Sequence, residues 1–155
     1  MTPAINLAKK EQVAHQVHEY THDETAESYG LEAAEKLGVV AERVFKTLVV
    51  VLDNKALAVG VLPVSSKLSM KHIAKAWGAK KAVMADKLDV ERSTGYVLGG
   101  VSPLGQKKRL KTAIDSSAKN HSTIYVSAGR RGLEIELSSD DLLKLTNGIL
   151  AELCQ

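Results

Sequence analysis

The chain has 155 residues, 45% of them hydrophobic and 25% charged, and a formal net charge of +3 at pH 7. This length holds one globular core and is short for two, so we expect a single domain over residues 1–155. No apolar run of about 18 residues could span a bilayer, no signal peptide is recognisable, and Cys154 has no second thiol with which to form a disulfide or a structural zinc site. We therefore expect a cytoplasmic protein that requires neither a metal nor a cofactor.

Hydrophobic periodicity, caps and turn residues predict alternating helices and strands along the chain. In order, these are a helix over residues 2–14, a strand over 15–22, a helix over 29–38, a hairpin over 43–63, a helix over 65–78, a strand over 81–85, a helix over 86–95, a strand over 111–115, a second hairpin over 122–138 and a helix over 138–154. This mixture predicts an α+β fold with a curved, mainly antiparallel or mixed β-sheet that is barrel-like and surrounded by helices.

Local signals mark several ends of these elements. Thr2 fits the N-cap of the first helix, and Gly38 suits the position just beyond the end of the second. Asp53–Asn54 is typical of a tight turn between two strands. Ser65 or Ser66 would cap the third helix.

Lys46 stands inside VFKTLVVVL (residues 44–52), a run so apolar that we expect both faces of the strand to be buried. A lysine in such a strand is costly unless its ammonium meets an anion, a polar pocket or water. Lys46 therefore indicates a pocket, although the side chain could instead reach solvent from the end of the strand.

The glycine pair Gly99 and Gly100 interrupts an apolar, β-like segment. It indicates that another backbone or a ligand approaches closely, or else a bulge that only curves the sheet. A basic cluster follows the glycines: Lys107, Lys108, Arg109 and Lys111. These cations could bind phosphates along a nucleic-acid backbone or form a solvated face.

The sequence pattern disfavours zinc-dependent catalysis and catalysis by a serine or cysteine nucleophile. His18 and His22 have the spacing that binds zinc on a helix, but on a strand they lie about 13 Å apart. No GxSxG motif is present, and Cys154 is close to a frayable end of the chain. A metal-dependent hydrolase that uses His18, His22 and Asp23 is therefore disfavoured.

Five strings of the sequence together resemble a known family: EAAEKLG (32–38), FKTLVV (45–50), MADK (84–87), STGYVLGGVSPLGQKKR (93–109) and TIYVSAGRRGLEIEL (123–137). Over nearly its whole length the chain is similar to the YbaK/prolyl-tRNA synthetase-associated domain family. The resemblance implies a trans-editing enzyme that hydrolyses Cys-tRNA(Pro), with some action on Cys-tRNA(Cys), in association with prolyl-tRNA synthetase. A pocket built for proline discriminates against a similar-sized side chain by only about 1–3 kcal/mol, so a second hydrolytic site would restore accuracy.

Matched position by position, the resemblance implies that Lys46 and Gly99 act in catalysis, with Lys46 holding the terminal adenosine or the ester. It implies a substrate pocket formed by Tyr20, Thr47, Gly100, Ser127, Gly129 and Glu134. It also implies tRNA phosphate contacts by Lys107, Lys108, Arg109 and Lys111. The family branch needs no protein nucleophile, because the substrate thiol attacks its own ester carbonyl while the protein orients the thiol and stabilises the oxyanion.

Two other functions stay open on the sequence alone. An editor of Ala-tRNA(Pro) would use water as its nucleophile and would cleave an alanine ester rapidly. A non-catalytic tRNA-binding adaptor would use the same basic cluster, bind tRNA in a salt-dependent manner and cleave no ester.

Overall fold

The computed structural model describes residues 1–25 and 28–155, and no helix within these ranges is long and apolar enough to cross a membrane. The α-helices are α1 (Pro3–Lys10), α2 (Tyr29–Leu37), α3 (Met70–Ala76), α4 (Lys87–Thr94) and α5 (Ser139–Thr146), with 3-10 helices at η1 (Ala41–Arg43) and η2 (Ser116–Asn120). The strands are β1 (His15–Glu19), β2 (Phe45–Leu52), β3 (Ala56–Pro63), β4 (Ala82–Met84), β5 (Lys111–Asp115), β6 (Ile124–Arg130), β7 (Leu133–Leu137) and β8 (Ile149–Ala151).

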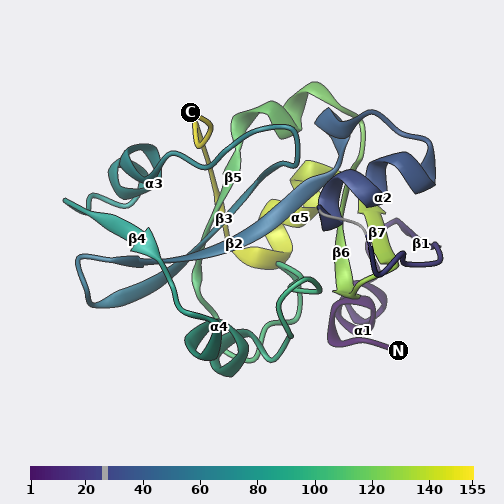
Figure 1. Cartoon of the computed structure of the whole chain (residues 1–155), viewed down its shortest axis with the longest axis horizontal. Coiled ribbons are helices and arrows are strands. Elements are labelled where there is room, and N and C mark those ends of the chain that lie inside the picture. Colours follow the sequence, from purple (N-terminus) through teal and green to yellow (C-terminus); the bar gives the residue numbers. More distant parts are fainter. Residues whose placement is uncertain (26–27) are drawn as a thin grey trace.

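The described strands form two sheets that meet at β2 (Figure 1). The smaller sheet has the order β1-β7-β6 and is antiparallel. The larger sheet has the order β4-β2-β3-β5-β8 and is mixed, because β5 pairs in parallel with both β3 and β8. A parallel bridge between Val44 and Tyr125 joins the start of β2 to β6. The predicted α+β class with a mixed sheet is confirmed, and the described strands form two joined sheets rather than a closed barrel.

Local sequence signals place several element ends correctly. The Thr2 hydroxyl caps α1 and accepts a hydrogen bond from the Ile5 N–H at 3.3 Å. Gly38 ends α2 in the left-handed conformation. Asp53 and Asn54, with φ of 50° and 58°, form the turn between β2 and β3. Asp and Asn tolerate this conformation better than most residues, which is why the turn could be predicted.

The start of α3 differs from the prediction. Its N-cap is Ser69, whose hydroxyl accepts a hydrogen bond from the N–H three residues later, and not Ser65 or Ser66. The chain before Ser69 is held by a tertiary contact, because Leu68 forms an antiparallel bridge with Cys154. This long-range pairing outweighs the helix signal of the two earlier serines.

The carboxyl-terminal helix is shorter than predicted. It ends where Asn147 adopts the left-handed conformation, and the chain then forms β8 beside β5. The N–H of Leu153 donates a hydrogen bond to the Asp115 carboxylate at 2.9 Å. Leu153 is fully buried, so the last residues complete the core beneath α3 instead of extending a surface helix.

The two faces of β2 pack against different layers. Phe45 and Val49 belong to a core that includes α1 and the β6–β7 pair, whereas Val50 and Leu52 pack with α3 and the carboxyl-terminal segment. Helix α2 covers the smaller sheet, where its alanines pack against Tyr125 (Figure 1). Val44, just before β2, belongs to this third cluster, so the start of the strand lies next to all three.

We expect Leu153→Ala to lower the free energy of unfolding by about 2–5 kcal/mol, because the substitution leaves a cavity in the core. Leu150→Ala is the matched control, since Leu150 lies in the same segment but is 36% exposed, and it should cost roughly 1 kcal/mol or less. Urea unfolding of the two variants measures the difference. Equal, small losses would contradict a structural role for the carboxyl-terminal segment.

Candidate active site

A cavity of about 370 Å³ opens between the start of α2, the first half of β2, the β6–β7 pair and the loop that follows α4. Six residues that the family resemblance implies line this cavity: Tyr20, Lys46, Thr47, Gly99, Ser127 and Glu134. These residues are distant in the sequence, and only the tertiary fold brings them together. The cavity is therefore the candidate active site.

Lys46 reaches the cavity from the start of β2. Burial lowers the pKa of its ammonium, the nearby Cys154 thiol opposes this shift, and the charge of Lys67 adds to it. Among residues 1–25 and 28–155, no carboxylate lies within ion-pairing distance of the Lys46 ammonium. The ammonium therefore remains available to an oxygen of a bound substrate.

Glu134 and Ser127 stand opposite each other on β7 and β6, so their side chains share the sheet face that borders the cavity. Burial raises the pKa of Glu134 to about 8. Burial, followed by the charge of Glu134, raises the pKa of Tyr20 to about 12. At neutral pH both Glu134 and Tyr20 are therefore protonated and can donate hydrogen bonds into the cavity.

The described lining of the cavity holds no activated nucleophile. The Ser127 hydroxyl accepts a hydrogen bond from the N–H of Gly129 at 3.1 Å, and the carboxyl beside it is the protonated Glu134, a poor general base. No histidine borders the cavity in the part of the chain that the structure describes. Hydrolysis in this cavity thus requires a nucleophile from the substrate or from water.

Tyr29 and Arg131 form a wall of the cavity that sequence reasoning missed. The Arg131 guanidinium lies 3.7 Å from the centroid of the Tyr29 ring, a cation–π contact. Gly99 supports this pair: a Cβ there would lie 2.9 Å from the ring and 3.0 Å from Arg131 Cδ, and its φ of +91° favours glycine. The tandem arginines of the β6–β7 turn were the only local signal, and nothing in the sequence indicated their distant aromatic partner.

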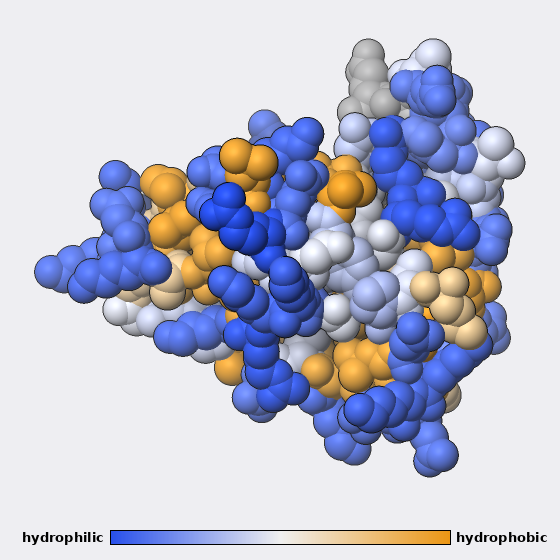
Figure 2. Space-filling view, turned by 90° about the horizontal axis from the view of Figure 1, so that it is seen from below, coloured by the Kyte–Doolittle hydropathy of each residue, from blue (hydrophilic) through white to orange (hydrophobic). Residues whose placement is uncertain are grey.

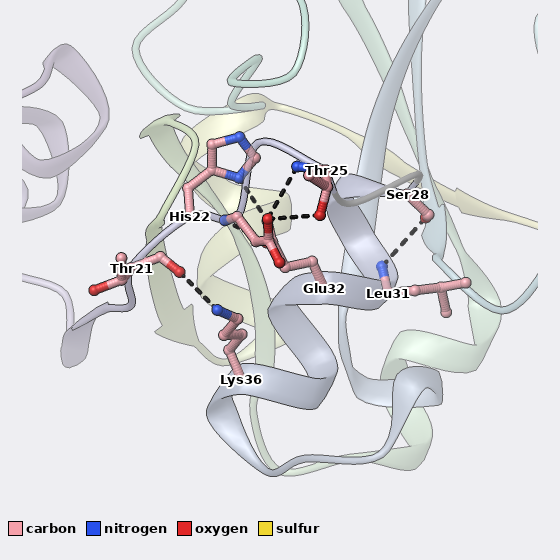
Figure 3. A network of polar contacts seen from close by, with 8 residues as sticks. Thr21, His22, Thr25, Ser28, Leu31, Glu32 and Lys36 are labelled. Carbon is pink, nitrogen blue, oxygen red and sulfur yellow. Dashed lines mark hydrogen bonds and ion pairs between the residues drawn. The ribbon is translucent and has the colours of Figure 1, made fainter.

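A polar network holds α2 against the segment that precedes it (Figure 3). The Glu32 carboxylate accepts hydrogen bonds from His22 Nδ1 and from the Asp23 N–H, both at 2.7 Å. The Lys36 ammonium donates to the Thr21 carbonyl at 2.9 Å. Burial alone would raise the pKa of Glu32, but the hydrogen bonds outweigh it and lower the pKa. The network thereby fixes the start of α2, which forms one side of the cavity.

The residues considered as metal ligands have structural partners instead. His22 and Asp23 belong to the α2 network, and His18 Nε2 lies 2.9 Å from the Glu136 carboxylate. Within the described ranges, no group of three or more His, Cys, Asp and Glu side chains is arranged to hold a metal ion. The geometry gives a metal-dependent mechanism no support.

Gly100 and Gly129, implied as substrate contacts, are packed against protein. A Cβ on Gly100 would lie 2.7 Å from the Arg130 Cα, and the Gly100 N–H donates to the Val97 carbonyl at 3.0 Å. A Cβ on Gly129 would lie 2.9 Å from the Tyr96 ring. The close approach predicted for the glycine pair is confirmed at Gly100, where the neighbour is another stretch of backbone. Contact of either glycine with substrate stays a prediction.

The basic cluster lies outside the cavity: Lys107, Lys108 and Arg109 are exposed at the end of the loop between α4 and β5, and Lys111 is the exposed first residue of β5. Lys108 and Arg109 border a second hollow of about 190 Å³, Lys107 is exposed beside them, and the Lys111 ammonium lies 5.5 Å from the centroid of the Trp77 ring. Seen from the side of α4, hydrophilic side chains surround separate hydrophobic patches (Figure 2). The cluster is thus accessible to a charged partner, and the cavity is a separate site.

The chain is similar in sequence to known proteins. Residues 23–145 match the family described as the aminoacyl-tRNA editing domain. The protein named "Putative Cys-tRNA(Pro)/Cys-tRNA(Cys) deacylase EbsC", from Enterococcus faecalis (strain ATCC 700802 / V583), is 41% identical over 155 residues, which cover 98% of this chain and 92% of the relative. The chain therefore belongs to the aminoacyl-tRNA editing domain family.

Two further relatives are more distant. The "Uncharacterized protein YwhH" of Bacillus subtilis (strain 168) is 27% identical over 125 residues, which cover 81% of this chain and 79% of that protein. The crystal structure described as a "putative trans-editing enzyme for prolyl tRNA synthetase" has a TM-score of 0.84 at 21% identity, and the match covers 100% of this chain and 99% of that one. This likeness shows that the two proteins share a fold.

The raised pKa of Glu134 has a measurable effect on stability. The unfolded chain releases this proton near pH 4.5, whereas the folded protein retains it to about pH 8, so the folded state binds more protons between these values. The free energy of unfolding should therefore fall as the pH rises through this window, by on the order of 1 kcal/mol per pH unit. Glu134→Gln should remove this contribution, as urea unfolding from pH 5 to pH 8.5 would show.

Glu136→Gln is the matched control on the same strand. Burial alone would raise the pKa of Glu136, but hydrogen bonds from Thr123 and His18 outweigh it and lower the pKa, so its contribution is lost only in acid. Above pH 5 this variant should keep the pH dependence of the wild type. If Glu134→Gln kept it as well, Glu134 would be ionised in the folded protein at neutral pH.

Proposed function

We propose that this chain is a trans-editing hydrolase that deacylates Cys-tRNA(Pro), with Cys-tRNA(Cys) as a second substrate. Membership of the editing-domain family and the name of the E. faecalis relative support the reaction class. The observation that carries the proposal is a cavity with a cation and several hydrogen-bond donors but, among its described lining, no activated nucleophile. Such a site suits a substrate that supplies its own nucleophile.

The proposed reaction proceeds within the substrate. The cysteinyl thiol attacks its own ester carbonyl, a carbon–sulfur bond forms, the ester carbon–oxygen bond breaks, and the thiol proton passes to the departing ribose oxygen. The products are a four-membered thiolactone, which water opens to cysteine, and tRNA with a free terminal hydroxyl. Lys46 holds the terminal adenosine or the ester, and the protein contributes orientation and electrostatic stabilisation.

Recognition of the rest of the tRNA would lie outside the cavity. The exposed cations Lys107, Lys108, Arg109 and Lys111 suit phosphate contacts, which add affinity without reading sequence. Selection of tRNA(Pro) would then come from association with prolyl-tRNA synthetase, in the cytoplasm where aminoacylation takes place.

The central test is single-turnover hydrolysis of Cys-tRNA(Pro), Ser-tRNA(Pro) and Ala-tRNA(Pro), each with and without EDTA. The wild type should cleave the cysteine ester alone and should be insensitive to EDTA. Lys46→Ala should be roughly 100-fold slower, because it loses the cation that holds the substrate. Lys55→Ala, an exposed lysine in the β2–β3 turn, serves as the control and should match the wild type.

Other outcomes would overturn parts of the proposal. Rapid cleavage of the alanine ester would favour an Ala-tRNA(Pro) editor that uses water. Binding of tRNA without cleavage of any ester would favour a non-catalytic adaptor. Full activity of Lys46→Ala would remove Lys46 from the mechanism.

The basic cluster is tested through salt dependence. For Lys107→Ala combined with Lys108→Ala, the slope of log Kd against log salt concentration should fall by about 0.7–0.9 for each phosphate that the variant no longer binds. Lys9→Ala combined with Lys10→Ala removes two exposed cations from α1 and should leave the slope unchanged. Equal slopes for all three proteins would place the tRNA phosphates elsewhere on the surface.

A further inference from the structure

The edge of β2 that faces away from β3 is shared by two other strands. At its far end β4 pairs with residues 50–52, and the Val49 carbonyl accepts a hydrogen bond from the Ala85 N–H at 3.0 Å. At its near end the bridge from Val44 to Tyr125 brings β6 alongside. Between these contacts no described strand pairs with this edge, and Thr47 lies in the gap.

The direction of the Thr47 backbone follows from the register. Val44 and Leu52 direct their carbonyls toward β3, where they accept hydrogen bonds from the Val64 and Lys55 N–H groups at 2.8 and 2.9 Å. Backbone N–H and C=O groups alternate between the two edges of a strand. Those of the even-numbered residues of β2 therefore point toward β3, and those of the odd-numbered residues point toward the other edge. The N–H and C=O of Thr47 therefore face the gap, where the cavity lies.

The side chain of Thr47, like its backbone, lacks a hydrogen-bond partner in the described part of the chain. Its hydroxyl oxygen is buried and has no hydrogen-bond partner among the described residues. Buried polar groups are nearly always hydrogen-bonded in native proteins, and a free strand edge is likewise a set of unused donors and acceptors. Thr47 thus presents unused hydrogen-bonding groups at the cavity that already contains Lys46 and Glu134.

An aminoacyl ester carries groups complementary to such an edge. Its α-nitrogen is a donor and its carbonyl oxygen is an acceptor. The nitrogen is bonded to the α-carbon and the oxygen to the adjacent carbonyl carbon, as in a single residue of a β-strand. In an antiparallel hydrogen-bonded pair, two residues exchange both bonds, N–H to C=O in each direction. The aminoacyl group can therefore pair with Thr47 as a strand one residue long.

We propose that the open edge of β2 at Thr47 binds the main-chain part of the aminoacyl group, with the Thr47 N–H donating to the ester carbonyl oxygen and the Thr47 C=O accepting from the α-ammonium. This inference rests on the proposed function and names the groups that hold its substrate. The same N–H stabilises the negative charge that develops on the carbonyl oxygen when the thiol attacks. Because the pairing ignores the amino-acid side chain, the thiol alone distinguishes cysteine from serine or alanine.

The first experiment replaces the Thr47 amide by an ester, which removes the N–H and keeps the side chain. Single-turnover cleavage of Cys-tRNA(Pro) should slow by about 100-fold, with tRNA affinity nearly unchanged. The melting temperature should fall only slightly, because the Thr47 N–H pairs with no described strand and only the Lys46 carbonyl, which faces β3, becomes a weaker acceptor. The same replacement at Val51, which is paired with β4, should lower the melting temperature and leave the rate of the folded protein unchanged. A rate within twofold of the wild type for the Thr47 ester would overturn the inference.

A second experiment uses the unaltered protein. The probe is 3′-cysteinylamido-adenosine, a non-hydrolysable mimic of the acylated tRNA end, and the readout is amide hydrogen exchange by NMR. Exchange at Thr47 should slow at least about tenfold when the probe is bound, and a probe without the α-amine should bind more weakly. An unchanged exchange rate at Thr47 with the probe bound would overturn this inference and leave the proposed function standing. Failure of the wild type to cleave Cys-tRNA(Pro) would instead overturn the proposed function.

Discussion

Strand β2 must satisfy backbone hydrogen bonds along both of its edges, and the site depends on how it does so. One edge is paired with β3 along the whole strand, whereas the other is divided between β6 at the start and β4 at the end. Backbone pairing with the smaller sheet therefore ends near Val44, and pairing with β4 begins only near residue 50, which leaves an unpaired interval between them. The cavity lies beside this interval, and its lining comes from β2, β6, β7, α2 and the loop after α4. The same division of the edge accounts for the two sheets. If one strand had paired with this edge of β2 along its whole length, no cavity would have remained there.

Burial disfavours the charged forms of both Lys46 and Glu134. It lowers the pKa of Lys46 and raises that of Glu134, so each group is shifted toward its neutral form. The exposed cations after α4 retain their hydration and stand apart from the cavity. The proposed chemistry and the proposed phosphate contacts thus belong to two separate regions of the molecule.

The predictable parts of this structure are those determined by short stretches of chain. The Asp53–Asn54 turn and the Gly38 cap depend on the conformational preferences of single residues, which the sequence displays. Lys46 by itself indicated a pocket, because it stands in an apolar strand. The set of residues that line the cavity could be predicted only through the family resemblance, because its members are separated by most of the chain. Strand β8 was missed because three apolar residues beside a helix look like one more turn, and only pairing with the distant β5 makes them a strand. The stacking of Arg131 on Tyr29 is a tertiary contact of the same kind.

The attachment of the carboxyl-terminal segment affects the order in which the protein can fold during synthesis. The β2–β3 and β6–β7 hairpins are local and can form as soon as their residues have left the ribosome. The larger sheet is different, because its outer strand β8 and the Leu68–Cys154 bridge use residues that are synthesised late. These residues hold the start of α3 and fill the core beneath it through Leu153. Until they emerge, the nascent chain must carry an exposed apolar sheet face, which makes this the stage at which it is most dependent on protection from aggregation.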